Sequence, residues 1–205
     1  MGKTRFLIGL FFIGILCIAG VCPVVAYHQG FDSISVPPYL ELGDLVFFDS
    51  TFRPGRWNVR GLDHVAIYLG DNHFVGTMRN TVKQVAEVNI TDYSYFFRVL
   101  HFVNPLFARV VSATPAQRQA ATAWALSRIG DLYQIWDPEK IADPSAQRVT
   151  ANRWYCSELV WAAYYQVGID LDQNGWKRDF PWGLPFWSAV SPQEIAADND
   201  VALLS

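Results

Sequence analysis

Apolar positions along this chain change their spacing near its middle. Up to residue 103 they fall in short runs of strand length separated by turn residues, whereas after residue 114 they recur at helical spacing. Strands that precede helices in this way predict an α+β fold. The sequence contains no internal repeat, low-complexity tract or Ser/Gly-rich linker, so we expect one domain.

The first half contains a predicted β-hairpin. Residues 64–69 and 73–78 are strand-like runs on either side of a Gly-Asp-Asn turn at 70–72, whose residues tolerate positive φ angles. The other strands that we expect cover residues 44–48, 82–88 and 98–103.

The second half contains two predicted helices. The first begins with residues 114–117, Thr-Pro-Ala-Gln, which supply an N-cap, a proline at the first helical position and a capping-box glutamine, and it ends at Gly130. The second begins at Cys156 and ends at Gly168. Apolar residues cover much of its surface, so we expect it to be a central, buried helix.

The N-terminal segment has the pattern of a signal peptide or a membrane anchor. Two basic residues precede an apolar run over 6–21, and small residues at 24–26 suit cleavage by a signal peptidase. The apolar stretch is also close to the roughly 20 residues that span a bilayer, so an uncleaved anchor stays open. We expect residues 1–26 to be this leader and residues 27–205 a secreted or extracytoplasmic domain with possible membrane association through the leader.

Composition and charge indicate that the chain can form a full core and limit the kinds of molecule that it can bind. Hydrophobic residues make up 51% of the chain, which is enough to give one domain a full core. Residues 1–26 hold two of the 16 basic residues and none of the 19 acidic ones, so residues 27–205 carry a net charge of −5. No basic cluster is present to neutralise phosphates, so we exclude nucleic acid as a partner.

Cys156 is the one cysteine in residues 27–205, because Cys17 and Cys22 lie in the leader. The domain therefore has no internal disulfide. The positive end of a helix dipole stabilises a thiolate, so we expect Cys156 to titrate below pH 7 with an imidazole nearby. The alternative is a buried, inert thiol.

A cysteine nucleophile needs a base, and His64 is the best placed of four histidines. It follows an aspartate and opens a strand, which puts it at the rim of the sheet where a central helix can present Cys156. Of the others, we expect His28 to be flexible, His73 to be exposed and His101 to be structural.

Three short motifs in this sequence resemble those of a known protein family. They read Gly-Asp-Leu-Val-Phe-Phe at 43–48, Asp-His-Val-Ala-Ile-Tyr-Leu-Gly at 63–70 and Tyr-Cys-Ser-Glu-Leu-Val at 155–160. Together they resemble the NlpC/P60 superfamily of papain-like cysteine hydrolases. The histidine precedes the cysteine, as in the circularly permuted branch with the YiiX/YebB-like proteins and the lecithin retinol acyltransferase group, and residues 191–195 also resemble that branch. The resemblance implies an antiparallel sheet packed on the central cysteine-bearing helix.

The same resemblance implies the catalytic roles. Cys156 would be the nucleophile and His64 the base, and the oxyanion would face the backbone N–H groups at the start of the Cys156 helix. The family places a Glu or His on the second hairpin strand to orient the imidazole, but residues 74–78 contain neither. Depending on the hairpin register, Thr77 or Asn80 shares the face of His64, and a backbone carbonyl or water is the remaining choice.

These roles predict an extracytoplasmic cysteine hydrolase that cleaves an amide bond in a cell-wall or other peptide. A thiol acyltransferase or lipid hydrolase, and a noncatalytic binding module with a degraded triad, are the alternatives. We expect no cofactor, because the sequence contains no phosphate loop or dinucleotide fingerprint. We also expect no metal, because the calcium-like loop at 170–175 is followed by Pro181 where a bidentate acid belongs.

Overall fold

The computed structural model describes residues 35–50, 62–134, 152–172 and 190–205. The strands of this part are β1 (Leu45–Ser50), β2 (His64–Gly70), β3 (His73–Asn80), β4 (Val85–Asp92), β5 (Phe102–Val110), β6 (Leu132–Tyr133), β7 (Arg153–Trp154) and β8 (Val201–Leu204). Its helices are α3 (Tyr93–Arg98), α4 (Pro115–Leu126), α7 (Cys156–Tyr165) and α8 (Pro192–Ala197).

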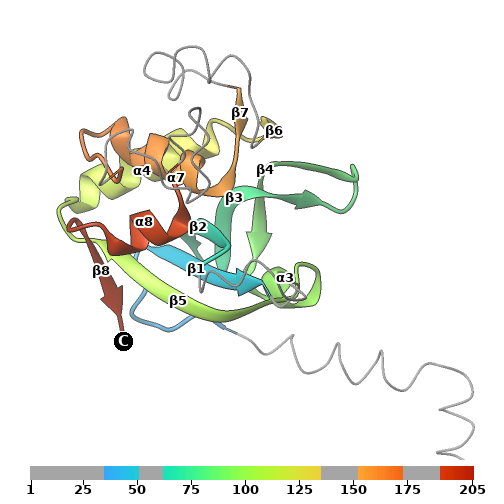
Figure 1. Ribbon diagram of the computed structural model, residues 1–205, viewed down its shortest axis with the longest axis horizontal. Helices are drawn as coiled ribbons and strands as arrows, with labels where there is room; N and C mark the ends of the chain where they lie inside the picture. Colours follow the sequence, from blue (N-terminus) through green and yellow to red (C-terminus); the bar gives the residue numbers. More distant parts are fainter. Residues whose placement is uncertain (1–34, 51–61, 135–151, 173–189) are drawn as a thin grey trace, which may run out of the picture.

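The described strands form one sheet of eight strands in the order β7-β6-β4-β3-β2-β1-β5-β8. Neighbouring strands are antiparallel, except that β6 and β7 are parallel. The sheet curls, with α4 and α7 at one end of the view and α3 at the other (Figure 1). The predicted α+β fold is therefore confirmed, with one parallel pair in a sheet that is otherwise antiparallel.

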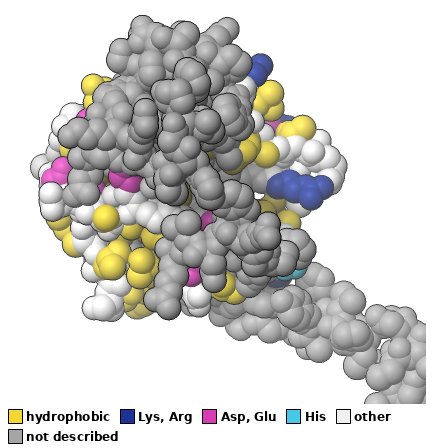
Figure 2. Space-filling view, in the orientation of Figure 1, with side chains coloured by type: hydrophobic (Ala, Val, Ile, Leu, Met, Phe, Trp, Pro, Cys, Tyr) yellow, Lys and Arg dark blue, Asp and Glu magenta, His cyan; other side chains and the backbone are white. Residues whose placement is uncertain are grey.

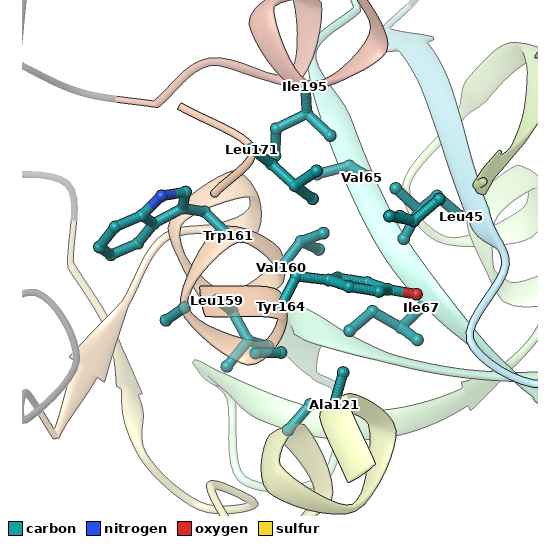
Figure 3. Close-up of a cluster of buried hydrophobic side chains, with 14 of the residues drawn as sticks. Leu45, Val65, Ile67, Ala121, Leu159, Val160, Trp161, Tyr164, Leu171 and Ile195 are labelled. Carbon is teal, nitrogen blue, oxygen red and sulfur yellow. The ribbon is translucent and has the colours of Figure 1, made fainter. Parts of the chain in front are cut away.

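Side chains of the central strands alternate between two hydrophobic clusters on opposite faces of the sheet, as the two-residue period of a strand requires. Val65 of β2 packs with Val160 of α7, whereas the next residue, Ala66, packs with Phe96 of α3. We call the first the α7 cluster, whose members in Figure 3 include Leu45, Val65, Ile67, Ala121, Leu159, Val160, Tyr164 and Ile195. The second, the α3 cluster, contains Val46, Phe48, Ala66, Tyr68, Phe74, Met78, Tyr93, Phe96 and Phe107.

The two predicted helices begin where their signals place them, and α7 ends at Tyr165, a little before Gly168, where its end was expected. At the start of α4, Thr114 Oγ1 accepts a hydrogen bond from the Gln117 backbone at 3.2 Å, and both halves of the capping box are present. The helix ends at Leu126, a little before Gly130, because the last N–H groups bond to carbonyls three residues back. Every residue of α7 from Cys156 to Tyr164 is buried, so the prediction of a central, buried helix is confirmed.

A buried ion pair fixes the entry to β1 relative to the helices. Asp44 is fully buried and accepts two hydrogen bonds from Arg109 of β5, at 2.8 and 2.7 Å. Beside it, the Tyr164 hydroxyl of α7 donates to the Gly43 carbonyl at 2.6 Å. Gly43 has a φ of +90°, and a Cβ there would lie 2.7 Å from the Cβ of Arg118 on α4. The start of β1 and the helices can approach this closely because residue 43 is a glycine.

Two predicted strands are shifted, and the helix α3 and the short strands β6, β7 and β8 were not predicted. The predicted strands over 82–88 and 98–103 are β4 and β5, each shifted toward higher numbers. The first shift arises because the Asn80 side chain accepts hydrogen bonds from the N–H groups of Val82 and Lys83, which makes a turn of residues that were expected to be extended. The helix α3 was not predicted, and its N-cap is Asp92, whose side chain accepts from the Tyr95 N–H at 3.2 Å.

The leader predicted for residues 1–26 lies outside the described residues. Across the described ranges, no helix combines the length and the apolar character that a membrane crossing needs. On the face seen in Figure 2, Lys and Arg side chains stand in small separate groups between hydrophobic and uncharged ones.

Candidate active site

Cys156 is the first residue of α7, and its thiol lies against the start of β2. Its side chain is buried, and the sulfhydryl donates to the Asp63 carbonyl oxygen across an Sγ–O distance of 4.0 Å. Val65 packs with Cys156 in the α7 cluster, and its backbone N–H acts to lower the pKa of the thiol. Asp63 and Val65 are the two neighbours of His64 in the sequence, so the fold brings Cys156 to the chain segment that carries His64.

The environment of the thiol keeps it protonated. Burial raises the pKa of Cys156, and this effect outweighs the opposing hydrogen bonds from backbone N–H groups and from the Ser157 hydroxyl. The direction is opposite to the predicted titration below pH 7, which is therefore wrong for this conformation. The prediction considered two effects that lower the thiol pKa, the helix N-terminus and a neighbouring imidazole. It did not consider the loss of water around a residue packed in the α7 cluster, which raises the pKa.

The His64 ring lies on the other face of the sheet. Its centroid is 5.0 Å from that of Phe102 and 5.8 Å from that of Phe96, beside the α3 cluster. The ring is buried, Nε2 has no hydrogen-bond partner among the described residues, and burial lowers the pKa of His64 to about 4. His64 is therefore neutral at pH 7 and, in this conformation, packs away from the thiol.

The hairpin register decides which residue of β3 faces the His64 ring. Ile67 of β2 pairs with Val75 of β3. The same antiparallel register, continued to the start of β2, sets His64 opposite Met78, which is one of the two alternatives left open by the sequence. Met78 belongs to the α3 cluster, in agreement with the position of the His64 ring.

Thr77 lies on the face of the sheet that carries α7. It pairs with Val88 of β4, a member of the α7 cluster, and it is buried. Its Oγ1 has no hydrogen-bond partner in the described part of the chain. The structure thus places Thr77 on the same face as Cys156 and on the opposite face from the His64 ring.

The Asn80 side chain makes its hydrogen bonds within the turn between β3 and β4 and to β4 itself. Its amide donates to a Glu87 carboxylate oxygen at 2.8 Å, and its carbonyl oxygen accepts from the N–H groups of Val82 and Lys83. Gly76 shares the face of His64 but has no side chain, and a Cβ there would lie 3.2 Å from the Ala66 Cβ. Neither Thr77 nor Asn80, the two residues considered from the sequence, therefore brings an orienting side chain to the His64 ring in this conformation.

Tyr133 is a residue of the site that the sequence did not reveal. It lies on β6, where it pairs with Trp154, two residues before Cys156. Burial of the phenol raises the pKa of Tyr133, and the charge of a Cys156 thiolate raises it further. A tyrosine that follows a helix-ending glycine has no pattern of its own, so only the pairing of two very short strands identifies it.

Two further histidines of the described residues, His73 and His101, lie at the surface. His73 is exposed, as predicted, with Nδ1 2.6 Å from the Asp71 carbonyl oxygen. His101 was expected to be structural in a strand, but it is exposed, with a φ of +53°, just before β5 begins. His28 lies outside the described residues. Among those that are described, no group of three or more His, Cys, Asp or Glu side chains is arranged to hold a metal ion.

Comparisons with known proteins agree with the permuted order of the motifs. The family model of the permuted papain-like amidase enzymes, YaeF/YiiX, C92 family, matches residues 39–204. The Uncharacterized protein YycO of Bacillus subtilis (strain 168) is 32% identical over 74 residues, which are 36% of this chain and 28% of YycO. A crystal structure described as metalloprotein YiiX from Escherichia coli O157:H7 is similar with a TM-score of 0.47 and 16% identity, covering 80% of this chain and 96% of that one.

These matches refine the resemblance drawn from the motifs. The family model supports the permuted papain-like fold and the YiiX-like branch, whereas NlpC/P60 is the name of a different superfamily. The match to YycO covers less than a third of that protein. Since the family model spans most of the sequence and the cysteine and histidine motifs both lie within it, this chain belongs to the permuted papain-like amidases of the YaeF/YiiX type, an enzyme family.

Proposed function

We propose that this protein is an extracytoplasmic cysteine amidase that cleaves an amide bond in a cell-wall or other peptide, with Cys156 as nucleophile and His64 as base. The observation that carries the proposal is the contact of the Cys156 thiol with Asp63 and Val65, the two neighbours of His64. The extracytoplasmic location rests on the sequence pattern of residues 1–26.

The proposed reaction begins with a movement of His64. In the described conformation the thiol and the imidazole are both neutral and lie on different faces of the sheet. His64 is the first residue of β2, so the proposed movement is a local rearrangement of the backbone at this strand end, which takes the ring away from Phe96 and Phe102 to the face where Cys156 lies. The imidazole then accepts the thiol proton, and the two groups become an imidazolium and a thiolate.

The following steps are those of acyl transfer through a thioester. The thiolate attacks the amide carbonyl carbon, and the oxyanion is stabilised by the backbone N–H groups of Cys156 and Ser157 at the start of α7. His64 gives its proton to the leaving amine as the C–N bond breaks, and it then takes a proton from the water that hydrolyses the thioester.

Hydrolysis of peptide amides by the full-length protein and its variants tests this proposal. We expect Cys156→Ala to abolish hydrolysis and His64→Gln to reduce it by at least about a hundredfold, the usual contribution of a general base. His73→Gln is the matched control, because it removes an exposed imidazole from the same hairpin. Full activity in Cys156→Ala would contradict the proposal, and acylation of Cys156 by a lipid ester but not by peptides would indicate acyl transfer instead.

A further inference from the structure

Arg79 is an exposed residue near the end of β3, on the face of the sheet that carries α7. Thr77 pairs with Val88, a member of the α7 cluster, and Arg79 pairs with Ala86 two residues further along the same ladder. Because side chains two residues apart on a strand lie on one face, Arg79 shares the face of Thr77. Unlike Thr77, Arg79 is exposed. A cation therefore stands at the surface on the face where the Cys156 helix packs.

The direction of α7 puts the nucleophile at the same end of the sheet as Arg79. The Cys156 thiol donates to the Asp63 carbonyl just before β2 begins, whereas the Tyr164 hydroxyl, near the other end of the helix, donates to the Gly43 carbonyl. The Gly43 N–H in turn bonds to a carbonyl near the end of β2. Since β2 and β3 are antiparallel, the start of β2 lies at the same end of the sheet as the end of β3. Arg79 therefore lies toward the end of the sheet where α7 begins.

The guanidinium of Arg79 is held by a neutral group. It donates to the Gln84 side-chain oxygen at 2.7 Å, and the Gln84 amide donates in turn to the Thr81 carbonyl. Within the described part of the chain, no carboxylate pairs with this guanidinium, whereas Lys83 of the same turn pairs with Glu87 at 2.9 Å. The bond to Gln84 orients the guanidinium and leaves further N–H donors for another molecule. Arg79 thus keeps its full positive charge and a defined orientation.

A carboxylate is the substrate group that matches this guanidinium. Arginine presents parallel N–H groups at the spacing of the two carboxylate oxygens, and hydrogen bonds between ionised partners are stronger than those between neutral ones. Residues 27–205 carry a net charge of −5, so the domain as a whole repels an acidic molecule. An uncompensated cation on the face of the nucleophile gives such a molecule a local point of attachment.

We propose that Arg79 determines the specificity of the amidase by binding a carboxylate that the substrate carries within a few residues of the scissile amide, so that the substrate is an acidic peptide. This inference rests on the proposed function, because it takes Cys156 as the nucleophile. Strand residues are spaced by about 3.4 Å, so Arg79 follows Thr77 by about 7 Å along β3, and an extended peptide covers the same span in two residues.

The test is the alkylation of Cys156 in the full-length protein by two probes that differ in one charge, the α-amides of N-iodoacetyl-glutamate and N-iodoacetyl-glutamine. Mass spectrometry of the peptide that contains Cys156 separates its labelling from that of Cys17 and Cys22. Each rate is divided by the rate of the same probe with free 2-mercaptoethanol. Both probes react with the same thiolate, so the ratio of their rates does not depend on the thiol pKa. We expect the wild-type protein to prefer the acidic probe by about fivefold, the upper end for an exposed ion pair, and Arg79→Gln to lose this preference.

Lys83→Gln is the matched control, because it removes one positive charge from the same turn on the other face of the sheet. Lys83 pairs with Glu87, and Glu87 lies opposite Met78 of the α3 cluster. We expect Lys83→Gln to keep the wild-type preference. Arg79→Lys should keep part of it, because the charge remains without the planar fork of the guanidinium.

Three results would overturn the role of Arg79. They are a wild-type protein that does not prefer the acidic probe, a preference that survives in Arg79→Gln, and an equal loss of preference in Lys83→Gln. A Cys156 thiol that reacts with neither probe would overturn it as well, because an acidic peptide would then not reach the nucleophile. Alkylation requires no turnover, so the labelling result stands apart from the hydrolysis assay, in which full activity of Cys156→Ala would remove the proposed function itself.

Discussion

The burial of His64 makes a quantitative prediction about stability and pH. Its pKa falls from 6.5 in the unfolded chain to about 4 in the folded protein. Above pH 6.5 the ring is neutral in both states, and its contribution to stability is fully present. As the pH falls from 6.5 toward 4, the unfolded chain binds a proton that the folded protein does not, so stability is lost. At 1.36 kcal/mol for each pKa unit, the loss by pH 4 is roughly 3 kcal/mol.

The perturbation that isolates this effect is His64→Phe, which places a ring that cannot titrate between Phe96 and Phe102. Urea unfolding at pH 7, 6, 5 and 4, followed by tryptophan fluorescence, gives the free energy of unfolding of each protein. Carboxylates titrate in both proteins and cancel in the difference. We expect the wild-type protein to lose about 3 kcal/mol relative to the variant between pH 7 and pH 4. His73→Gln controls for the removal of a histidine as such.

The sign of this difference distinguishes two states of the site. If His64 in solution were an imidazolium paired with the Cys156 thiolate, its pKa would be raised above 6.5. The pair would then stabilise the wild-type protein below pH 6.5, and this stability would be lost as the pH rose through the higher pKa. Parallel stability curves for the wild-type protein and His64→Phe, or a difference of this opposite sign, would refute the buried, neutral ring.

Three further experiments test the framework of the site. Arg109→Met leaves the fully buried Asp44 without its bidentate partner, and we expect urea unfolding to show that the free energy of unfolding falls by roughly 3 kcal/mol. An unchanged free energy of unfolding would contradict a stabilising role for the Asp44–Arg109 ion pair. Gly43→Ala adds a Cβ that would lie 2.7 Å from the Arg118 Cβ, at a φ of +90°, and we expect it to lower the free energy of unfolding by several kcal/mol. Gly130→Ala has a similar φ of +95° but open space around the new Cβ, and we expect it to cost about 1 kcal/mol. Equal losses in the two variants would contradict the close approach of residue 43 to α4. Thr77→Val removes a buried hydroxyl that has no partner among the described residues, so we expect unchanged or slightly higher stability and unchanged hydrolysis; a large loss of activity would restore Thr77 as a catalytic residue.

The features that the sequence predicted correctly are those with local causes. The β2–β3 turn contains Asp71 and Asn72, at φ angles of 48° and 62°, and these residue types tolerate such angles. The start of α4 is determined by the capping box at Thr114, which involves residues only three apart. The buried Cys156 helix is determined by its own apolar surface. Each of these signals can be evaluated without knowing where the rest of the chain lies.

The features that the sequence missed depend on distant partners. The residues of α3, Tyr-Ser-Tyr-Phe-Phe-Arg, are aromatic and suggest a strand, but Phe96 packs in the α3 cluster against strands that come much earlier in the chain. The strands β6 and β7 have two residues each, too few for any period, so the position of Tyr133 could not be derived. For His64, the sequence left two hairpin registers open, and the choice between them depends on the pairing of Ile67 with Val75.

The position of His64 shows which contacts the resting state gains and which hydrogen bond it lacks. Alternation along β2 sends Val65 to the α7 cluster, so the ring of His64 must turn to the other face as long as the strand is regular. There it gains contact with Phe96 and Phe102, but Nε2 is left without a partner among the described residues, which costs about 1–3 kcal/mol. Movement to the thiol gives up the aromatic contacts and recovers that cost through a hydrogen bond to sulfur. A substrate that binds the second state better shifts the population toward it, so the proposed function requires the substrate to favour the state in which the base contacts the nucleophile.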